Sequence, residues 1–249
     1  MKQFIVAANW KMQRPFKETI QWCTTHKDAL ASLSKKTESE LILCPDFVAL
    51  HPVRQLLHNT SVRLGAQDCS EYDHGAYTGQ VSAQSLADVE CTYCIIGHSE
   101  RRQYSTESNE SIARKMEQLI KNNIQPIVCV GETKNEYEQK ETFSILQKQL
   151  EPLFTAAEKN PPHTVCIAYE PVWAIGTGLV PEPAYLTTVF EWLDKNCSKI
   201  CDSAGLRLLY GGSVSETTAA SIKSIPHVEG FLVGGASLDF QKFKNIVLL

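Results

Sequence analysis

The chain has 249 residues, of which 43% are hydrophobic and 21% charged, and its formal net charge is −4. This is ordinary globular composition, and it excludes a disordered chain, a collagen-like repeat and a coiled coil. The apolar runs are strand-sized, far short of the roughly 18 residues of a membrane helix, so we expect no membrane span. The small negative charge argues against nucleic acid and acidic membrane surfaces as partners. The amino-terminal residues lack the apolar length of a secretion signal, and we expect a cytoplasmic protein.

Short apolar, β-branched runs recur along the chain, each followed by a longer amphipathic segment. They predict about eight strands, at residues 4–8, 41–44, 62–66, 93–96, 125–130, 165–169, 207–210 and 230–233. Between them, residues 143–153 and 186–197 repeat apolar side chains at helical spacing. Such strands indicate a parallel sheet covered by helices, and we predict an α/β protein whose residues 1–249 form one (β/α)8 barrel domain. An open doubly wound sheet is the alternative, although no G-x-G-x-x-G turn follows the first run.

Nine cysteines are many for this length, but their number is odd and their spacing irregular. Cys91 and Cys94 enter a predicted strand, where residues three apart point to opposite faces, whereas Cys197 and Cys201 share one face of a predicted helix. A zinc or redox role for these pairs is the alternative. We expect the cysteines to pack as small apolar side chains in a reducing compartment, and we predict no metal site.

Polar residues stand where several predicted strands end, which is where parallel barrels bind and react with their ligands. Glu170 lies between a strand and a proline that holds it extended, so its carboxylate should project at the end of the strand as a candidate general base. His98 begins a short polar stretch that can form one helical turn, where the helix dipole favours an uncharged ring that donates a hydrogen bond. A solvated carboxylate and a structural histidine are the plain alternatives.

The last two predicted strands are each followed by a Gly-Gly pair, the second being Gly234 and Gly235. Small residues let backbone N–H groups approach a ligand, and Ser213 and Ser215 can begin the next helix, whose end favours anions. Barrels often bind phosphate here, and Lys11 can supply a balancing positive charge. A simple turn and a surface lysine are the alternatives.

The segment that follows Glu170 predicts a movable lid, with a stiff beginning and a small, permissive end whose closure would exclude water. Its residues are Pro171, Val172, Trp173, Ala174, Ile175, Gly176, Thr177 and Gly178.

Together these motifs resemble the triosephosphate isomerase family over essentially the whole chain. The matching segments follow the family's order, at residues 9–11, 96–102, 129–133, 168–178, 210–213 and 232–238. The resemblance implies a TIM barrel that interconverts D-glyceraldehyde 3-phosphate and dihydroxyacetone phosphate through an enediolate, in glycolysis and gluconeogenesis, with no cofactor. Another phosphate-binding barrel enzyme, an aldolase or a biosynthetic isomerase, is the alternative, and a non-catalytic scaffold would be favoured if Glu170 or His98 were missing.

The resemblance also implies the roles of individual residues. Glu170 would move a proton between two substrate carbons while His98 polarises the carbonyl. Asn9 and Lys11 would bind the phosphorylated triose, and Glu100 would support the site beside them.

By the same resemblance, backbone N–H groups near the substrate's phosphate would come from Gly176, Ser213, Gly234 and Gly235. Tyr210 and Ser213 would latch the closed lid.

The resemblance further implies a homodimer in which residues 67–80 form a protruding loop, with Thr78 near its tip entering the partner's site. Gln80 stands where the family usually has Glu, and the usual partner of that carboxylate matches Arg101. Asp68 replaces the usual Asn. We therefore expect the family's ion pair between the subunits, here at positions 80 and 101, to become a weaker hydrogen bond or to rearrange.

Beyond the lid, the family often continues Ala-Thr-Pro, whereas this chain has Pro181, Glu182 and Pro183. Pro183 fits the first position of a helix, Glu182 is a poorer cap than Thr, and Pro181 should stiffen the hinge. We therefore expect altered lid opening.

Overall fold

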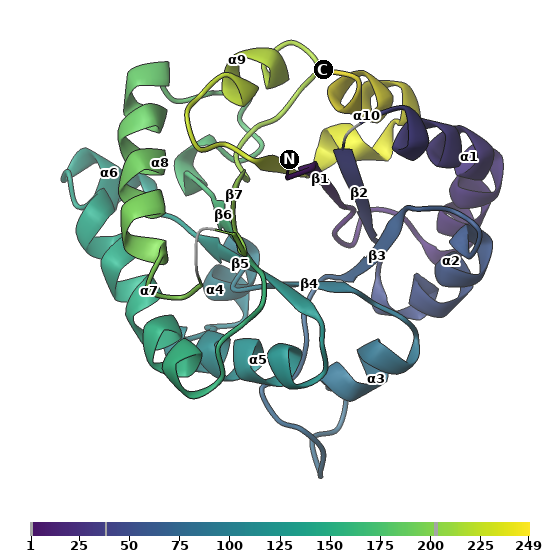
Figure 1. Cartoon of the computed structure of the whole chain (residues 1–249), viewed down its shortest axis with the longest axis horizontal. Helices are drawn as coiled ribbons and strands as arrows, with labels where there is room; N and C mark the ends of the chain where they lie inside the picture. Colours follow the sequence, from purple (N-terminus) through teal and green to yellow (C-terminus); the bar gives the residue numbers. More distant parts are fainter. Residues whose placement is uncertain (1, 38, 202–203) are drawn as a thin grey trace.

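The computed structural model describes residues 2–37, 39–201 and 204–249 (Figure 1). Within these residues, eight parallel strands pair in chain order, and the last pairs with the first to close a barrel. The strands are β1 (Phe4–Asn9), β2 (Ser39–Cys44), β3 (Arg63–Ala66), β4 (Tyr93–Ile96), β5 (Gln125–Val130), β6 (Val165–Tyr169), β7 (Leu206–Tyr210) and β8 (Gly230–Val233). The predicted (β/α)8 barrel is confirmed.

Helices surround the barrel as an outer ring (Figure 1). They are α1 (Phe16–Lys36), α2 (Leu50–Leu57), α3 (Ala83–Asp88), α4 (Ser99–Tyr104), α5 (Asn109–Lys121), α6 (Lys134–Glu138), α7 (Thr142–Lys159), α8 (Pro183–Cys197), α9 (Ala219–Lys223) and α10 (Phe240–Val247). Single 3₁₀ turns form at η1 (Phe47–Ala49), η2 (Val172–Ala174) and η3 (Gly235–Leu238). Among the described helices, none is both long and apolar enough to cross a membrane.

The apolar runs located the strands well because every strand is buried on both sides. β4, β5, β6 and β8 have the predicted bounds, and the other strands differ by one or two residues at one end. Val62 was predicted to begin the third strand, yet the strand begins at Arg63. Val62 is buried beside the barrel, but it forms no strand pair with β2. The apolar run in the sequence therefore begins one residue before the strand does.

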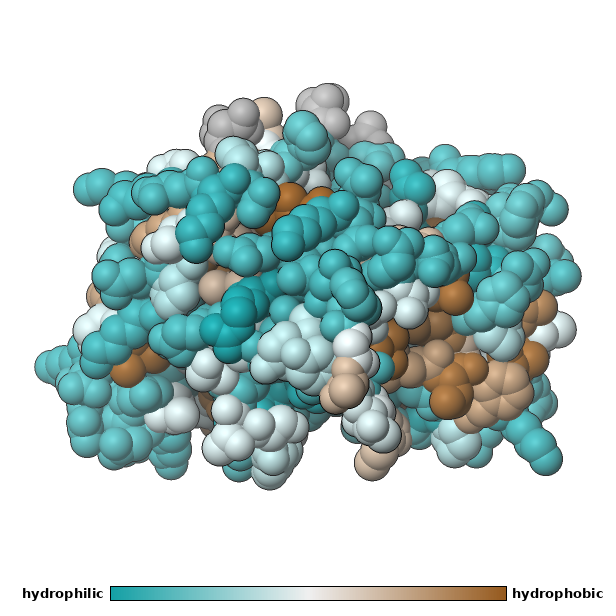
Figure 2. Space-filling view, turned by 90° about the horizontal axis from the view of Figure 1, so that it is seen from below, coloured by the Kyte–Doolittle hydropathy of each residue, from teal (hydrophilic) through white to brown (hydrophobic). Residues whose placement is uncertain are grey.

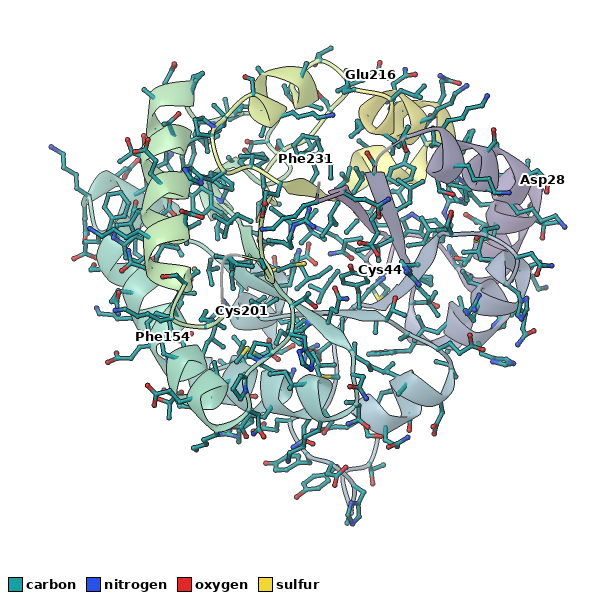
Figure 3. The ribbon with its side chains drawn as sticks, in the orientation of Figure 1. Asp28, Cys44, Phe154, Cys201, Glu216 and Phe231 are labelled. Carbon is teal, nitrogen blue, oxygen red and sulfur yellow. The ribbon has the colours of Figure 1, made fainter. Side chains whose placement is uncertain are left out.

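Two apolar layers hold the barrel and its helices together. Side chains such as Ile42, Ile127 and Leu209 fill the barrel interior, and a larger cluster packs between the strands and the helices. A Cβ on Gly65 would lie 2.6 Å from the Cys44 sulfur, so glycine is needed where β3 crosses this interior. Figure 3 shows Cys44 on the barrel and Phe154 in the outer helical layer.

All nine cysteines are buried, as predicted for core side chains. Burial raises the pKa of Cys91 and of Cys166 to about 12, which disfavours their reactive thiolates. The prediction that Cys197 and Cys201 share a helix face is wrong, because α8 ends at Cys197 and the Cys201 thiol reaches the Pro162 carbonyl. Within the described residues, no three His, Cys, Asp or Glu side chains gather as a metal site.

Candidate active site

Glu170 lies where β6 ends, and its side chain is almost fully buried, with 2% of the residue exposed. Its backbone N–H donates to the Val130 carbonyl at 2.7 Å, which continues the β5–β6 pairing by one step. Two glycines make room for it. A Cβ on Gly131 would lie 1.7 Å from the Glu170 carbonyl oxygen, and one on Gly211 would lie 2.9 Å from Glu170 Cγ. The strand ends therefore fix this carboxylate tightly.

His98 is the residue just before α4, which is the helical turn predicted from the sequence. The Glu100 backbone N–H donates to His98 Nδ1 at 3.2 Å. Because Nδ1 accepts that bond, the neutral ring carries its proton on Nε2. Nε2 lies 3.2 Å from Glu170 Oε1, and the Ser99 backbone N–H donates to Glu170 Oε2 at 3.0 Å. The imidazole and the carboxylate thus face each other, and Nε2–H, the hydrogen-bond donor expected of an uncharged ring, points toward Glu170.

Lys11 follows β1 in a left-handed backbone conformation, with φ of 51°, which is uncommon for a residue with a side chain. Its N–H donates to Asn9 Oδ1 at 3.1 Å, and this bond helps to hold the turn. The ammonium Nζ lies 2.6 Å from Glu100 Oε1. Because α4 supplies both Glu100 and the cap residue His98, one short helix connects the ammonium with the imidazole.

A cavity of about 340 Å³ opens at this end of the barrel. It is lined by Asn9, Lys11, Gln13, His98, Glu170, Ile175, Gly176, Gly178, Gly211, Gly212, Ser213, Val214, Ser215, Thr218, Leu232, Gly234, Gly235 and Ala236. It brings together the predicted base, imidazole and ammonium with the predicted phosphate-binding backbone. A larger cavity of about 470 Å³ is lined by Asp68 and Arg101 among others, but it contains none of these groups. The chemistry therefore favours the smaller cavity.

The predicted phosphate side of the cavity is lined by backbone. A Cβ on Gly235 would meet no atom within 4 Å, and one on Gly234 would meet only Lys11 Cε, at 3.7 Å. Open space above these glycines leaves their N–H groups accessible to a ligand. Ser213 and Gly176 line the same cavity from the seventh strand end and from the lid. The sequence missed Gln13, Val214 and Thr218, which carry no motif of their own.

The predicted lid begins with a single 3₁₀ turn, η2, formed by Val172, Trp173 and Ala174 after Pro171. The Ala174 carbonyl accepts hydrogen bonds from Ser213 Oγ at 2.6 Å and from Thr177 Oγ1 at 3.1 Å.

The end of the lid adopts backbone conformations that favour glycine, with φ of 71° at Gly176 and 78° at Gly178. Ile175, between the turn and these glycines, lines the cavity. Pro183 begins α8 as predicted, and the preceding Glu182 makes no side-chain cap.

Tyr210 ends β7 and is fully buried, and burial raises the pKa of its hydroxyl. Among the described residues, no group forms a hydrogen bond with that hydroxyl. A Cβ on Gly212 would lie 2.3 Å from it, so the hydroxyl lies directly beneath the loop that lines the cavity.

Two of the three residues predicted at a dimer contact, Gln80 and Arg101, line the larger cavity, and Thr78 is exposed. Within the chain, Gln80 accepts a hydrogen bond from Ser70, and Arg101 Nε lies 2.9 Å from Asp68 Oδ2.

Two polar side chains that hold the site were assigned no role there from the sequence, although both lie in segments that match the family. Gln67 Nε2 donates to the carbonyls of Lys11 and Cys44, both at 2.9 Å. Glu132 is fully buried and accepts from Trp173 Nε1 at 2.9 Å and from the Tyr169 and Tyr185 hydroxyls. Both stand just beyond a predicted strand, so the signal used for Glu170 could have found them.

A protein-family model described as triosephosphate isomerase matches residues 4–249. The chain is 40% identical to triosephosphate isomerase of Dictyoglomus thermophilum, over 99% of both chains. It is also 40% identical to triosephosphate isomerase of Thermus thermophilus, over 98% of this chain and 97% of the relative. Its identity to triosephosphate isomerase of Alkaliphilus oremlandii is 38%, over 99% of each.

Proposed function

The chain belongs to the triosephosphate isomerase family, which interconverts D-glyceraldehyde 3-phosphate and dihydroxyacetone phosphate in glycolysis and gluconeogenesis, and we propose that Glu170, His98 and Lys11 perform this reaction here. The observation that supports these roles is that the three side chains line one cavity from three different strand ends. We further propose that residues 1–249 act as one domain in the cytoplasm.

The reaction begins when the Glu170 carboxylate removes a proton from the carbon next to the substrate carbonyl. Nε2–H of the neutral His98 donates to the oxygen on which negative charge develops. The Lys11 ammonium stabilises the same charge from the wall of the cavity. Glu170 then returns the proton to the neighbouring carbon, while the hydroxyl proton of the enediolate passes to the former carbonyl oxygen by way of His98 Nε2, and the isomeric product results.

The backbone around Gly176, Ser213, Gly234 and Gly235 binds the substrate phosphate in this proposal. The phosphate then lies across the cavity from Glu170 and fixes the reacting carbons beside the carboxylate. Closure of residues 171–178 excludes water, which protects the enediolate from losing its phosphate.

We propose a homodimer that uses the loop between β3 and α3, which projects from the barrel in Figure 1. Met12 is 95% exposed and Val48 70% exposed, and Phe47, Tyr72 and Tyr77 are also exposed. Aromatic residues and Met are enriched at protein interfaces. Figure 2, which views the molecule from the side of this projecting loop, shows hydrophobic side chains grouped among hydrophilic ones.

The roles can be tested by the conversion of glyceraldehyde 3-phosphate to dihydroxyacetone phosphate, without added metal, in water and in deuterium oxide. We expect Glu170→Gln to lower kcat by about 10³-fold and to abolish deuterium incorporation into recovered substrate. Lys11→Met should lower kcat by about 10²-fold or more. Incorporation at the wild-type rate in Glu170→Gln would show that another group is the base.

The dimer can be tested by sedimentation over a wide range of concentration, with activity measured on the same samples. We expect a dimer at all concentrations that retain full activity. A stable, active monomer would contradict the proposal.

A further inference from the structure

Gln67 and Asp68, which follow β3 directly, are linked to the two members of the Lys11–Glu100 ion pair by separate routes, one through the Lys11 backbone and one through helix α4. Gln67 bonds to the Lys11 backbone, and Asp68 bonds to Arg101, the neighbour of Glu100 in α4. Since the ion pair joins residues from β1 and α4, its geometry depends on how these two elements are held relative to each other.

The first route acts on the backbone of Lys11. Gln67 Nε2 donates to the Lys11 carbonyl and to the Cys44 carbonyl, both at 2.9 Å. This side chain therefore ties the left-handed turn after β1 to the end of β2. An L-residue in that conformation persists only where its surroundings determine it. Gln67 supplies one such constraint from the carbonyl side, while Asn9 supplies the other from the N–H side.

The second route acts on α4 through a ring of four charged side chains, of which three are buried and Arg101 is 38% exposed. Lys115 Nζ lies 2.7 Å from Asp68 Oδ1 and also contacts Glu107, and Arg101 Nε lies 2.9 Å from Asp68 Oδ2 and 3.3 Å from Glu107 Oε1. The side chains of Asp68, Lys115 and Glu107 are 12% exposed or less. Burial lowers the pKa of Lys115, but the two carboxylates outweigh it and raise that pKa, so Lys115 stays charged.

Helix α4 needs such an anchor because a helix of six residues, Ser99–Tyr104, is far too short to be stable alone. Arg102 holds one side of it by donating to the Gly97 and Cys129 carbonyls. Arg101 holds the other side. Of the two carboxylates that Arg101 contacts, Asp68 is the one that lies next to Gln67 in the chain.

We propose that Gln67 and Asp68 are positioning residues for the reaction: together they set the place of the Lys11 ammonium against Glu100, and so against the oxyanion. This proposal rests on the role of Lys11 given above. Asp68 touches no substrate and acts through Arg101 and α4. A purely structural role would instead affect folding stability alone, with the same turnover in every folded molecule.

The main variant is Asp68→Asn, which keeps the shape of the side chain and removes its charge. We expect kcat to fall about tenfold, because small displacements of a catalytic group are costly. Inhibition by inorganic phosphate should change by less than about twofold, since the phosphate contacts are untouched. Binding of 2-phosphoglycolate, whose carboxylate takes the place of the enediolate, should weaken about as much as kcat.

Glu71→Gln is the matched control. Glu71 lies in the same loop as Asp68 and pairs with Arg114 of α5, the helix that also carries Lys115. Within the described residues, none of its hydrogen bonds or ion pairs reaches α4. It should leave kcat within about twofold of wild type. An equal loss in this control would assign the effect to the loop and overturn the proposal.

The route through Glu100 is tested by a double-mutant cycle. In a Glu100→Gln background, Asp68→Asn should lower kcat by less than about twofold, because the contact that it positions is already lost. A further tenfold loss there would overturn the proposal, as would Asp68→Asn with a lower melting temperature and unchanged kcat.

Gln67→Met keeps the test decisive if Asp68→Asn does not fold, and a second-site variant tests the carboxylate itself. Gln67→Met removes both hydrogen bonds to the strand-end carbonyls and should also lower kcat about tenfold. Adding Gln80→Glu to Asp68→Asn returns a carboxylate to the cavity that both residues line with Arg101, and it should restore kcat to within about threefold. Unchanged kcat in Gln67→Met would overturn the proposal. If instead the proposed role of Lys11 is wrong, Lys11→Met will keep full activity, and this result distinguishes the two failures.

Discussion

The two ends of the barrel use their polar side chains differently. At the carboxyl-terminal end, Glu170, His98 and Lys11 line an open cavity of about 340 Å³. At the amino-terminal end, polar groups bond mainly to one another. Glu229 pairs with Lys2 at 3.1 Å and with Arg207 at 3.4 Å.

The two ends also differ in how their polar side chains are held. Glu40, at the amino-terminal end, is held by the Tyr93 hydroxyl at 2.9 Å and by Arg63 at 3.2 Å. At the other end, the Tyr210 hydroxyl has no partner among the described residues, and Lys11 has a strained backbone. Groups that must act on a ligand cannot all be satisfied by the protein, so one end of the same strands serves stability and the other serves function.

Among the variants that test this comparison of the two ends, Glu170→Asp has the largest expected effect. The shorter side chain withdraws the carboxylate from the reacting carbon, so we expect kcat to fall by about 10²-fold or more. The melting temperature should change little, because the charge and the surrounding glycines remain. Steady-state kinetics and thermal unfolding of the same preparation measure both. Near-wild-type turnover would contradict the role of Glu170 as the base, and with it the functional role of the carboxyl-terminal end.

A smaller effect is expected at the rear hinge of the lid from Pro181→Ala. Proline fixes its own φ and restricts the residue before it, so replacement should loosen the hinge and change the exchange rate of residues 171–178 by about two- to fivefold. Relaxation-dispersion NMR measures this rate directly. An unchanged rate would mean that the hinge lies elsewhere, for example at Gly176 and Gly178.

Glu132 is an exception in the comparison of the two ends: it lies at the carboxyl-terminal end, but its carboxylate accepts hydrogen bonds from the protein itself. Burial raises its pKa above the ordinary value, although Trp173, Tyr169 and Tyr185 donate to it. The folded chain therefore keeps this proton to higher pH than the unfolded chain does. The resulting stability is complete below the unfolded pKa of about 4.3 and declines as pH rises toward the raised value.

Urea unfolding of wild type and Glu132→Gln between pH 4 and 7 tests this sign. The stability of wild type relative to the variant should fall as pH rises. A relative stability that rises with pH would mean that the three donors lower the carboxyl's pKa more than burial raises it.

The sequence predicted the strands and most of the cavity, since both depend on patterns local in the chain. Burial on both sides marks every strand, and parallel strands bring all their carboxyl ends to one rim, so Glu170 and His98 could be placed there together. Contacts of side chains across the fold leave no such pattern. That Gln67 bonds to the Lys11 carbonyl depends on the curvature that brings β1, β2 and β3 together. That Cys201 lies beyond α8 depends on where the helix ends, which periodicity fixes poorly.

The smallest expected effect is at the amino-terminal end, from Glu229→Gln. The carboxylate is 28% exposed, and it accepts from Lys2 and from the Leu208 backbone N–H, so its loss should cost about 1 kcal/mol and lower the melting temperature by about 2–4 °C. Turnover should be unchanged, because nothing at that end lines the cavity. The control is Glu216→Gln, at the outer edge in Figure 3, whose carboxylate accepts from Asn245 and should cost less. A fall in kcat for Glu229→Gln would mean that the interior of the barrel transmits strain along the strands, and the separation of the two ends would then fail.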